Sequence, residues 1–121
     1  MFVNAVADAV AEDFPDVKIS TLAYMDTFLP PRTVRPRPNV IIHLATDRHA
    51  WFHPFAMVTE TDEFQNAMKG WAAIGANIHI WHYTANVWHY LAPIPNMPFV
   101  TDDIRFFFDH NAVGIMLQGA W

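Results

Sequence analysis

Residues 39–46, Asn-Val-Ile-Ile-His-Leu-Ala-Thr, form a nearly continuous apolar run that constrains the fold more than any other segment of the chain. A strand of this composition has both of its faces covered, as happens in parallel sheets on which crossover helices pack. Residues 77–83 form a second strand-like run. The sequence therefore predicts an α/β fold with a parallel sheet.

Two further elements near the start of the chain are predicted from periodicity. Apolar residues at helical spacing predict a helix over residues 3–14, and β-branched residues predict a strand over residues 17–24. Thr61 is the expected N-cap of a second helix, which ends at Gly75. The apolar stripe of this helix comprises Phe64, Ala67, Met68 and Trp71.

A third helix and a last strand are predicted after a proline-rich loop. Thr101 is the expected cap of this helix, and Asn111 ends it. Its buried face is expected to carry Ile104, Phe107 and Phe108, and residues 113–117 form the last strand. The predicted order is α β β α β α β, with four parallel strands and three helices.

The predicted connections are unequal in length. Links from a helix to the next strand are short (15–16, 75–76 and 111–112), whereas links that leave a strand are long (25–38, 47–60 and 84–100). In α/β folds of this kind, function lies at the long-loop end of the sheet. Four parallel strands alone would leave apolar edges unpaired. We therefore predict that residues 1–121 form a single partial domain, the second half of a (β/α)8 TIM barrel.

Composition argues against several classes of function. The net charge is −5, and the only cluster of basic residues in the sequence is Arg32, Arg35 and Arg37. Nucleic acid is therefore not an expected partner. The chain has no cysteine, which excludes disulfide and thiolate chemistry. No apolar run reaches the ~18 residues of a membrane span. The arginine trio suits a clamp for a sugar carboxylate or, alternatively, a solvated loop.

Imidazole and aromatic side chains gather in residues 77–90, where a strand meets a long loop. Strand alternation places Ile78, Ile80 and His82 on one face of the sheet, and His79, Trp81 and Tyr83 on the other. Trp81, Trp88, Tyr83 and Tyr90 are candidates for an aromatic platform, and packing inside a barrel is the alternative.

The histidines also raise the question of a metal site. His49 and His53 have i, i+4 spacing, but Pro54 follows them and the glutamate of His-Glu-x-x-His is absent. His43 lies in an apolar run and is expected to be a core residue. We predict that the chain binds no metal and no cofactor.

A set of short motifs spans nearly the whole chain in a characteristic order. It resembles the C-terminal half of an uncharacterised bacterial family with a glycoside-hydrolase-like (β/α) barrel, distantly similar to α-glucuronidases and β-hexosaminidases. The residues that carry the resemblance include Phe14-Pro15-Asp16-Val17, Ala23-Tyr24, Pro36-Arg37-Pro38-Asn39-Val40, His53-Pro54, Ile80-Trp81, Tyr83, His89-Tyr90, Ile104-Arg105-Phe106-Phe107, Gly114-Ile115 and Gln118-Gly119.

The resemblance implies a carbohydrate substrate, a missing N-terminal half of the same barrel, and a secreted or periplasmic full-length protein. In the family, the position of His82 usually carries aspartate, and that of Leu117 an acidic residue. Glycoside hydrolysis normally needs two carboxyl groups. The absence of both acids implies that this fragment alone is inactive, and it leaves open whether the full-length protein is an enzyme.

Two aspartates, Asp26 and Asp47, lie just beyond the C-terminal ends of predicted strands. Asp47 is the better candidate for a general base or an acceptor for a substrate hydroxyl, and capping of a turn is the alternative for both. The other predicted substrate-binding residues are His82, Gln118, Tyr83, Trp81, His53 and Asp26.

Three functions therefore remain as hypotheses. The first is one wall of the sugar site of a glycoside-hydrolase-like barrel. The second is a carbohydrate-binding barrel without catalysis. The third is a complete small His-rich domain that binds a metal or another ligand.

Overall fold

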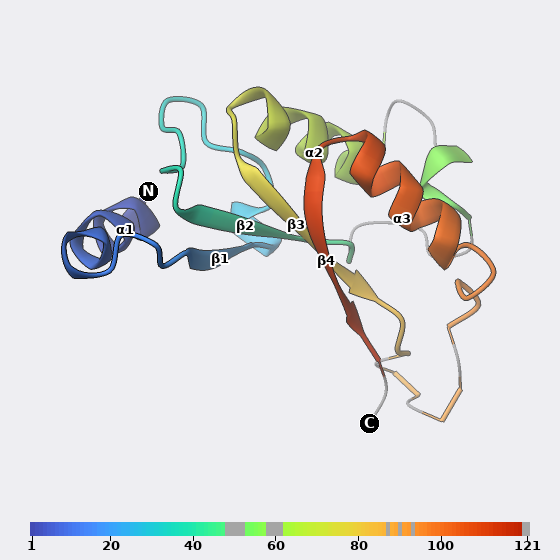
Figure 1. Ribbon diagram of the computed structural model, residues 1–121. Coiled ribbons are helices and arrows are strands. Elements are labelled where there is room, and N and C mark those ends of the chain that lie inside the picture. Colours follow the sequence, from blue (N-terminus) through green and yellow to red (C-terminus); the bar gives the residue numbers. More distant parts are fainter. Residues whose placement is uncertain (48–52, 58–61, 87, 90, 93, 120–121) are drawn as a thin grey trace.

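The chain builds a parallel sheet with helices on one of its faces (Figure 1). The computed structural model describes residues 1–47, 53–57, 62–86, 88–89, 91–92 and 94–119. Within them the helices are α1 (Phe2–Asp13), α2 (Glu63–Ala73) and α3 (Val100–Asp109), and two single turns of 3₁₀ helix are η1 (Met25–Thr27) and η2 (Phe55–Met57). The strands are β1 (Ile19–Ala23), β2 (Val40–Ala45), β3 (Asn77–Tyr83) and β4 (Ala112–Gln118).

The strands pair in the order in which they occur along the chain. The sheet order is β1-β2-β3-β4, and all three pairings are parallel, as the apolar run of β2 predicts. The register shifts between Ile78 and His79, because Ile78 lies opposite Ala112 whereas His79 lies opposite Gly114. Val113 is therefore the extra residue of a β-bulge.

Alternation divides β3 into a buried and a half-buried set of side chains, as the sequence predicts. Ile78, Ile80 and His82 are buried, and the residues between them are half-buried. The buried set continues across β2 through Val40, Ile42 and Leu44. This face packs against phenylalanines from the helices and from η2, and the ring centroids of Phe55 and Phe64 are 4.8 Å apart.

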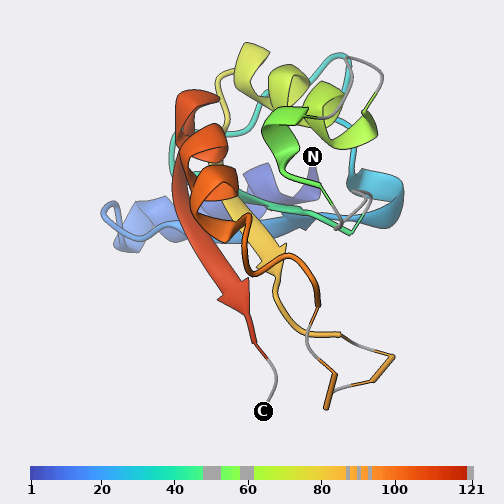
Figure 2. The same cartoon turned by 90° about the vertical axis from the view of Figure 1, so that its right-hand side faces the viewer.

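Helices α2 and α3 lie on the same face of the sheet (Figure 2). The stripe predicted for α2 is confirmed, because Phe64, Ala67, Met68 and Trp71 are all buried. In α3 the buried phenylalanines are Phe106 and Phe107, so the prediction that Phe108 is buried is wrong.

The caps of these two helices differ from the predictions. Thr101 lies inside α3, whose N-cap is Phe99, so the prediction of a Thr101 cap is wrong. Thr61 lies outside the described residues, and the Asp62 side chain accepts a hydrogen bond from the Gln65 N–H of α2 at 2.9 Å. Gly75 and Asn111 follow the helices with φ values of 75° and 69°. This left-handed conformation, which glycine and asparagine tolerate, reverses the chain within the short links to β3 and β4.

Helix α1 is attached to the loop that precedes β2. Asn4 donates a hydrogen bond to the Arg35 carbonyl oxygen at 2.8 Å, and Asn39 donates to the Ala7 carbonyl oxygen at 3.0 Å. The Arg37 guanidinium forms a two-pronged ion pair with Asp8, with Nε to Oδ1 at 2.8 Å and Nη2 to Oδ2 at 2.9 Å. One member of the arginine trio therefore has a structural partner. Strand β1, which follows α1 in the chain, begins at Ile19, two residues later than predicted.

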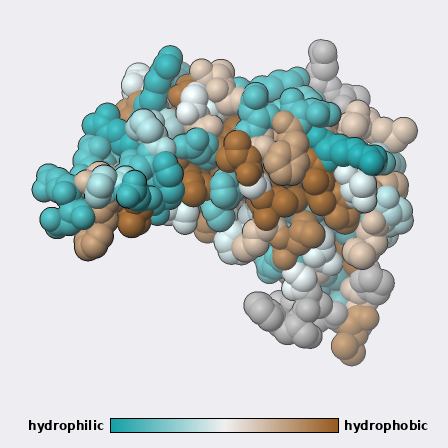
Figure 3. Space-filling model, in the orientation of Figure 1, coloured by the Kyte–Doolittle hydropathy of each residue, from teal (hydrophilic) through white to brown (hydrophobic). Residues whose placement is uncertain are grey.

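Both edges of the sheet carry exposed apolar side chains. A patch covers the side where β4 meets α3 (Figure 3), and its exposed members include Phe108, Val113 and Leu117. Leu22 is exposed on the other edge strand, β1. The predicted asymmetry of the connections is confirmed, since the long ones all leave the C-terminal ends of strands. No helix in the described ranges has the length and apolarity needed to cross a membrane.

Gly70 provides a test of the packing between α2 and the loop after β1. A Cβ atom at this position would lie 2.8 Å from Cγ of Pro30. Alanine normally stabilises a helix by about 1 kcal/mol relative to glycine. Because overpacking costs about 1–3 kcal/mol, we expect Gly70→Ala to lower the free energy of unfolding.

The measurement is a denaturant titration followed by circular dichroism. Gly119→Ala is the matched control, because a Cβ atom there meets no atom within 4 Å. A Gly70→Ala variant that is more stable than the wild type would refute this account of the packing.

Candidate functional site

The face of the sheet opposite the helices carries rows of polar and aromatic side chains. Because the strands are parallel and in register, Leu22, His43, His79 and Gly114 form one row across the sheet. The next row toward the C-terminal end contains Trp81 and Met116, and the last contains Tyr83 and Gln118. We call this surface, from His43 to Gln118, the uncovered face.

Two histidines of the uncovered face stack on each other. The rings of His43 and His79 have centroids 5.3 Å apart and an interplanar angle of 21°. His79 also lies against Gly114, where a Cβ atom would be 2.7 Å from its ring. The pKa of the His43 imidazole is lowered, first by partial burial and then by His79. His43 is half-buried on this face and is not a core residue, so that prediction is wrong.

Trp81 is held in a defined orientation at the end of β3. Its indole Nε1–H donates a hydrogen bond to Oε1 of Gln118 at 2.6 Å, from the neighbouring strand β4. The His43 ring and the indole form a T-shaped pair, with centroids 6.5 Å apart. The structure therefore brings together two predicted substrate-binding residues, Trp81 and Gln118, and fixes the plane of the indole.

The Asp47 carboxyl influences the pKa of Tyr83 at the same end of the sheet. The pKa of the Tyr83 phenol is raised, first by partial burial and then by the charges of Tyr24 and Asp47. Tyr24 follows β1 directly, Asp47 lies two residues after β2, and Tyr83 is the last residue of β3. The phenol therefore stays protonated near neutral pH and can donate a hydrogen bond to a ligand, while the Asp47 carboxylate can accept one.

Behind this site, the helix-covered face holds a buried polar network. The Thr46 hydroxyl lies 3.1 Å from Nδ1 of His82, and Nε2 of His82 lies 3.8 Å from Oδ2 of Asp103. Asp103 Oδ1 accepts a hydrogen bond from the Phe55 N–H at 2.9 Å. All three side chains of the network are at most 2% exposed.

The predicted substrate-binding residue His82 therefore lies on the face opposite Trp81 and Tyr83, and the structure does not bring it together with them. Its network reaches the site through Thr46, whose hydroxyl oxygen accepts a hydrogen bond from the Tyr83 N–H at 3.3 Å. Thr46 N–H donates to the Trp81 carbonyl oxygen at 3.1 Å. These bonds join the ends of β2 and β3, from which Asp47 and Tyr83 extend.

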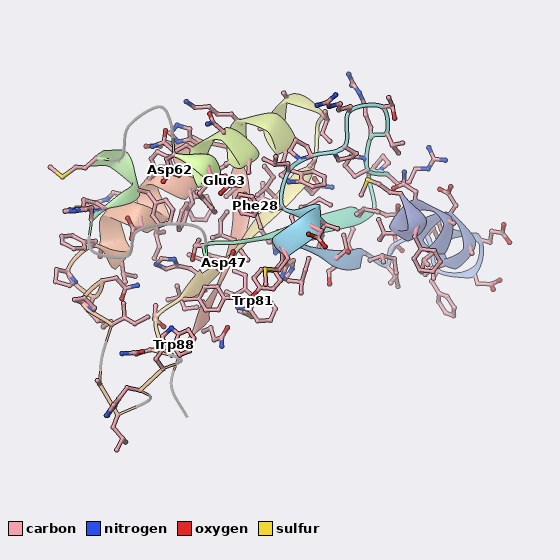
Figure 4. The ribbon with its side chains drawn as sticks, turned by 180° about the vertical axis from the view of Figure 1, so that it is seen from behind. Phe28, Asp47, Asp62, Glu63, Trp81 and Trp88 are labelled. Atoms are coloured by element: carbon pink, nitrogen blue, oxygen red, sulfur yellow. The ribbon has the colours of Figure 1, made fainter. Side chains whose placement is uncertain are left out.

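Two other predicted residues lie elsewhere. Asp26, in η1, lines a pocket of about 420 Å³ at the β1 edge, together with apolar residues of α1 that include Phe2. His53 is exposed and precedes η2, which packs against α3. Figure 4 shows Asp47 at the end of β2, with Trp81 on the side of the sheet away from α2.

Sequence reasoning did not select Tyr24, His43 and His79 as site residues. Strand pairing places His43 beside His79, and it brings Tyr24, which follows β1, to the same end of the sheet as Tyr83. Within the described ranges, no three His, Asp or Glu side chains are grouped so that they could hold a metal ion. His49, one half of the spaced histidine pair, lies outside those ranges.

Stability is predicted to depend on pH through His43. Because folding lowers the pKa of this imidazole, the unfolded chain binds the proton more readily. The stabilising contribution of the neutral ring is complete above pH of about 6.5 and is lost as pH falls through the folded-state pKa. We expect the melting temperature of the wild type to fall more steeply between about pH 7.5 and about pH 5.5 than that of His43→Gln.

Thermal melts at the two pH values measure this difference. His89→Gln, which alters an exposed histidine of the loop after β3, is the control and should keep the slope of the wild type. Equal slopes for His43→Gln and the wild type would refute the prediction.

Comparison with known proteins assigns the chain at the level of a family. Residues 1–121 match the family described as "Domain of unknown function (DUF4838)". No curated protein and no solved structure matches the chain. Because the match extends over residues 1–121, the chain belongs to the DUF4838 family of domains.

Proposed function

We propose that this chain forms one wall of a carbohydrate site in a glycoside-hydrolase-like (β/α) barrel. The observation that carries the proposal is the Trp81 indole, which lies on the uncovered face with its N–H bonded to Gln118 at 2.6 Å. Because the N–H is engaged, a ligand would contact the flat face of the indole and not its N–H. Sugar rings have apolar C–H faces that pack against aromatic rings, and their hydroxyls need polar partners beside the ring.

One of those polar partners is bonded to the indole, and two others lie at the same end of the sheet. The amide of Gln118, the phenol of Tyr83 and the carboxylate of Asp47 supply both donors and acceptors. In the proposed site, Tyr83 donates to a sugar oxygen and Asp47 accepts from a hydroxyl or acts as a general base. His82 supports the site from behind the sheet, through Thr46.

Three features of the fold support a barrel that continues beyond this chain. The strands pair in sequential order, without the reversal that marks a doubly wound sheet. The α2 and α3 crossovers lie on one face, as on the outside of a barrel. The exposed apolar side chains at both edges suit further strands, which would come from an N-terminal half of the same barrel.

A carbohydrate-binding barrel without catalysis is the second candidate. Strands β3 and β4 carry His82 and Leu117 near their C-terminal ends, and neither side chain is a carboxyl group. Hydrolysis needs two carboxyl groups about 5–9.5 Å apart, so an enzyme would require a second acid in addition to Asp47, which the N-terminal half of the barrel would supply. Binding without turnover would identify the second candidate.

The test of binding uses a glycan array and a titration of the best ligand with the full-length protein. We expect Trp81→Ala to weaken binding about tenfold or more, equivalent to about 1.4 kcal/mol, because the stacking surface is lost. Gln118→Leu should weaken binding less, because it frees the indole without removing it. The control is Met57→Ala, which removes an exposed apolar side chain from η2, on the helix-covered side of the sheet. Absence of glycan binding, or unchanged binding by Trp81→Ala, would reject the proposal.

The test of catalysis uses aryl glycosides with the same protein. We expect Asp47→Asn to reduce turnover by about 10²–10⁴-fold, as removal of a general acid or base does. Glycan affinity should change far less, because the amide keeps the shape of the carboxylate and can still hydrogen bond. Normal turnover by Asp47→Asn would exclude the catalytic role of this residue.

A further inference from the structure

Trp88 is the feature that the site described so far leaves unexplained. Its side chain is 91% exposed, in the loop between β3 and α3, and Leu91 in the same loop is 93% exposed. Burying an aromatic ring is among the largest gains of folding, so a fully displayed indole beside a binding site indicates a surface for a ligand.

The turn that carries Trp88 is held by specific hydrogen bonds. Oδ1 of Asn86 accepts from the Trp88 N–H at 3.1 Å and from the His89 N–H at 3.2 Å. The backbone carbonyl oxygen of Asn86 also accepts from the His89 N–H at 3.1 Å. An asparagine that bonds to the backbone two residues on forms an Asx turn, which fixes the direction of the chain.

The base of the loop is anchored to the sheet. Ala85, Ile94 and Asn96 are buried, and the Asn96 side chain donates to the Tyr83 carbonyl oxygen at 2.8 Å. Thr84 is bonded to the backbone carbonyl oxygen of Gln118 through both its N–H, at 2.9 Å, and its hydroxyl, at 2.8 Å. The loop therefore starts from the residue whose side chain holds Trp81.

Trp88 and Trp81 lie on the same side of the sheet, away from α2 (Figure 4). One indole is fixed on a strand with its N–H engaged, and the other is displayed from a braced turn five residues after Tyr83. Two aromatic surfaces in succession suit a chain of sugar rings, in which one unit packs on each surface.

We propose that Trp88 forms an outer subsite, so that the ligand has at least two linked sugar units and the outer unit stacks on this indole. This inference rests on the proposed function. It adds a minimum length for the ligand and names the residue that binds the outer sugar unit. Trp81 binds the inner sugar unit. Trp88 determines how much more tightly a longer glycan binds than a single sugar.

The test compares one-unit and three-unit ligands of the same sugar by isothermal titration with the full-length protein. The probes are N-acetylglucosamine and its β-1,4 trimer, xylose and xylotriose, and glucose and cellotriose. Trp88→Ala is expected to weaken binding of the trimer about tenfold and to leave that of the single sugar unchanged. Trp88→Phe should restore most of the affinity for the trimer, because it restores an aromatic face. Trp81→Ala should weaken binding of both.

Leu91→Ala is the matched control, because it removes an equally exposed apolar side chain from the same loop. A wild type that binds the single sugar and the trimer equally would overturn the inference and leave the proposed function standing. An equal loss of affinity in Trp88→Ala and Leu91→Ala would also overturn it, since the effect would then belong to the loop as a whole and not to the Trp88 ring. A wild type that binds none of these sugars and no glycan on the array would reject both proposals.

Discussion

The alternation of side chains along β3 is the constraint on which the rest of the structure depends. Successive residues of a strand point to opposite faces, and β3 is hydrogen bonded on both sides, to β2 and to β4. Its even-numbered residues therefore build the core beneath α2 and α3, and its odd-numbered residues build the uncovered face. A shift of one residue in the pairing would exchange these two surfaces and destroy both, so the same register sets the packing and the site.

The organisation of the chain could be predicted from the sequence, because it depends on local patterns. The apolar run of β2, the stripe of α2 from Phe64 to Trp71, and the short links at Gly75 and Asn111 all have local physical causes. The cap of α3 could not be predicted this way. The helix begins at Val100 after Phe99, without a side-chain cap, and the Asp103 carboxylate of its first turn accepts a hydrogen bond from the Phe55 N–H of η2, a tertiary contact that local sequence does not reveal.

The candidate site was predictable only in part, for a related reason. Trp81 and Gln118 could be selected from their places at strand ends, but the bond between them required the register of β3 and β4. His43 was misplaced because a single imidazole in an apolar run looks like a core residue, and only pairing with β3 places it over His79. For His82, alternation alone grouped it with Ile78 and Ile80, which the structure buries, whereas the expected resemblance to a glycoside-hydrolase-like barrel made it a substrate-binding candidate.

Sequential pairing of the strands also bears on how the molecule assembles during synthesis. Each strand joins the one made just before it, so its partner has already left the ribosome when the new strand appears. Contacts between neighbours in the sequence close small loops, whose entropy cost is modest. The growing sheet always ends in its newest strand, and β4 presents apolar Val113 and Leu117 at that edge. A nascent chain paused at this point would expose an aggregation-prone apolar edge strand to chaperones and to other nascent chains.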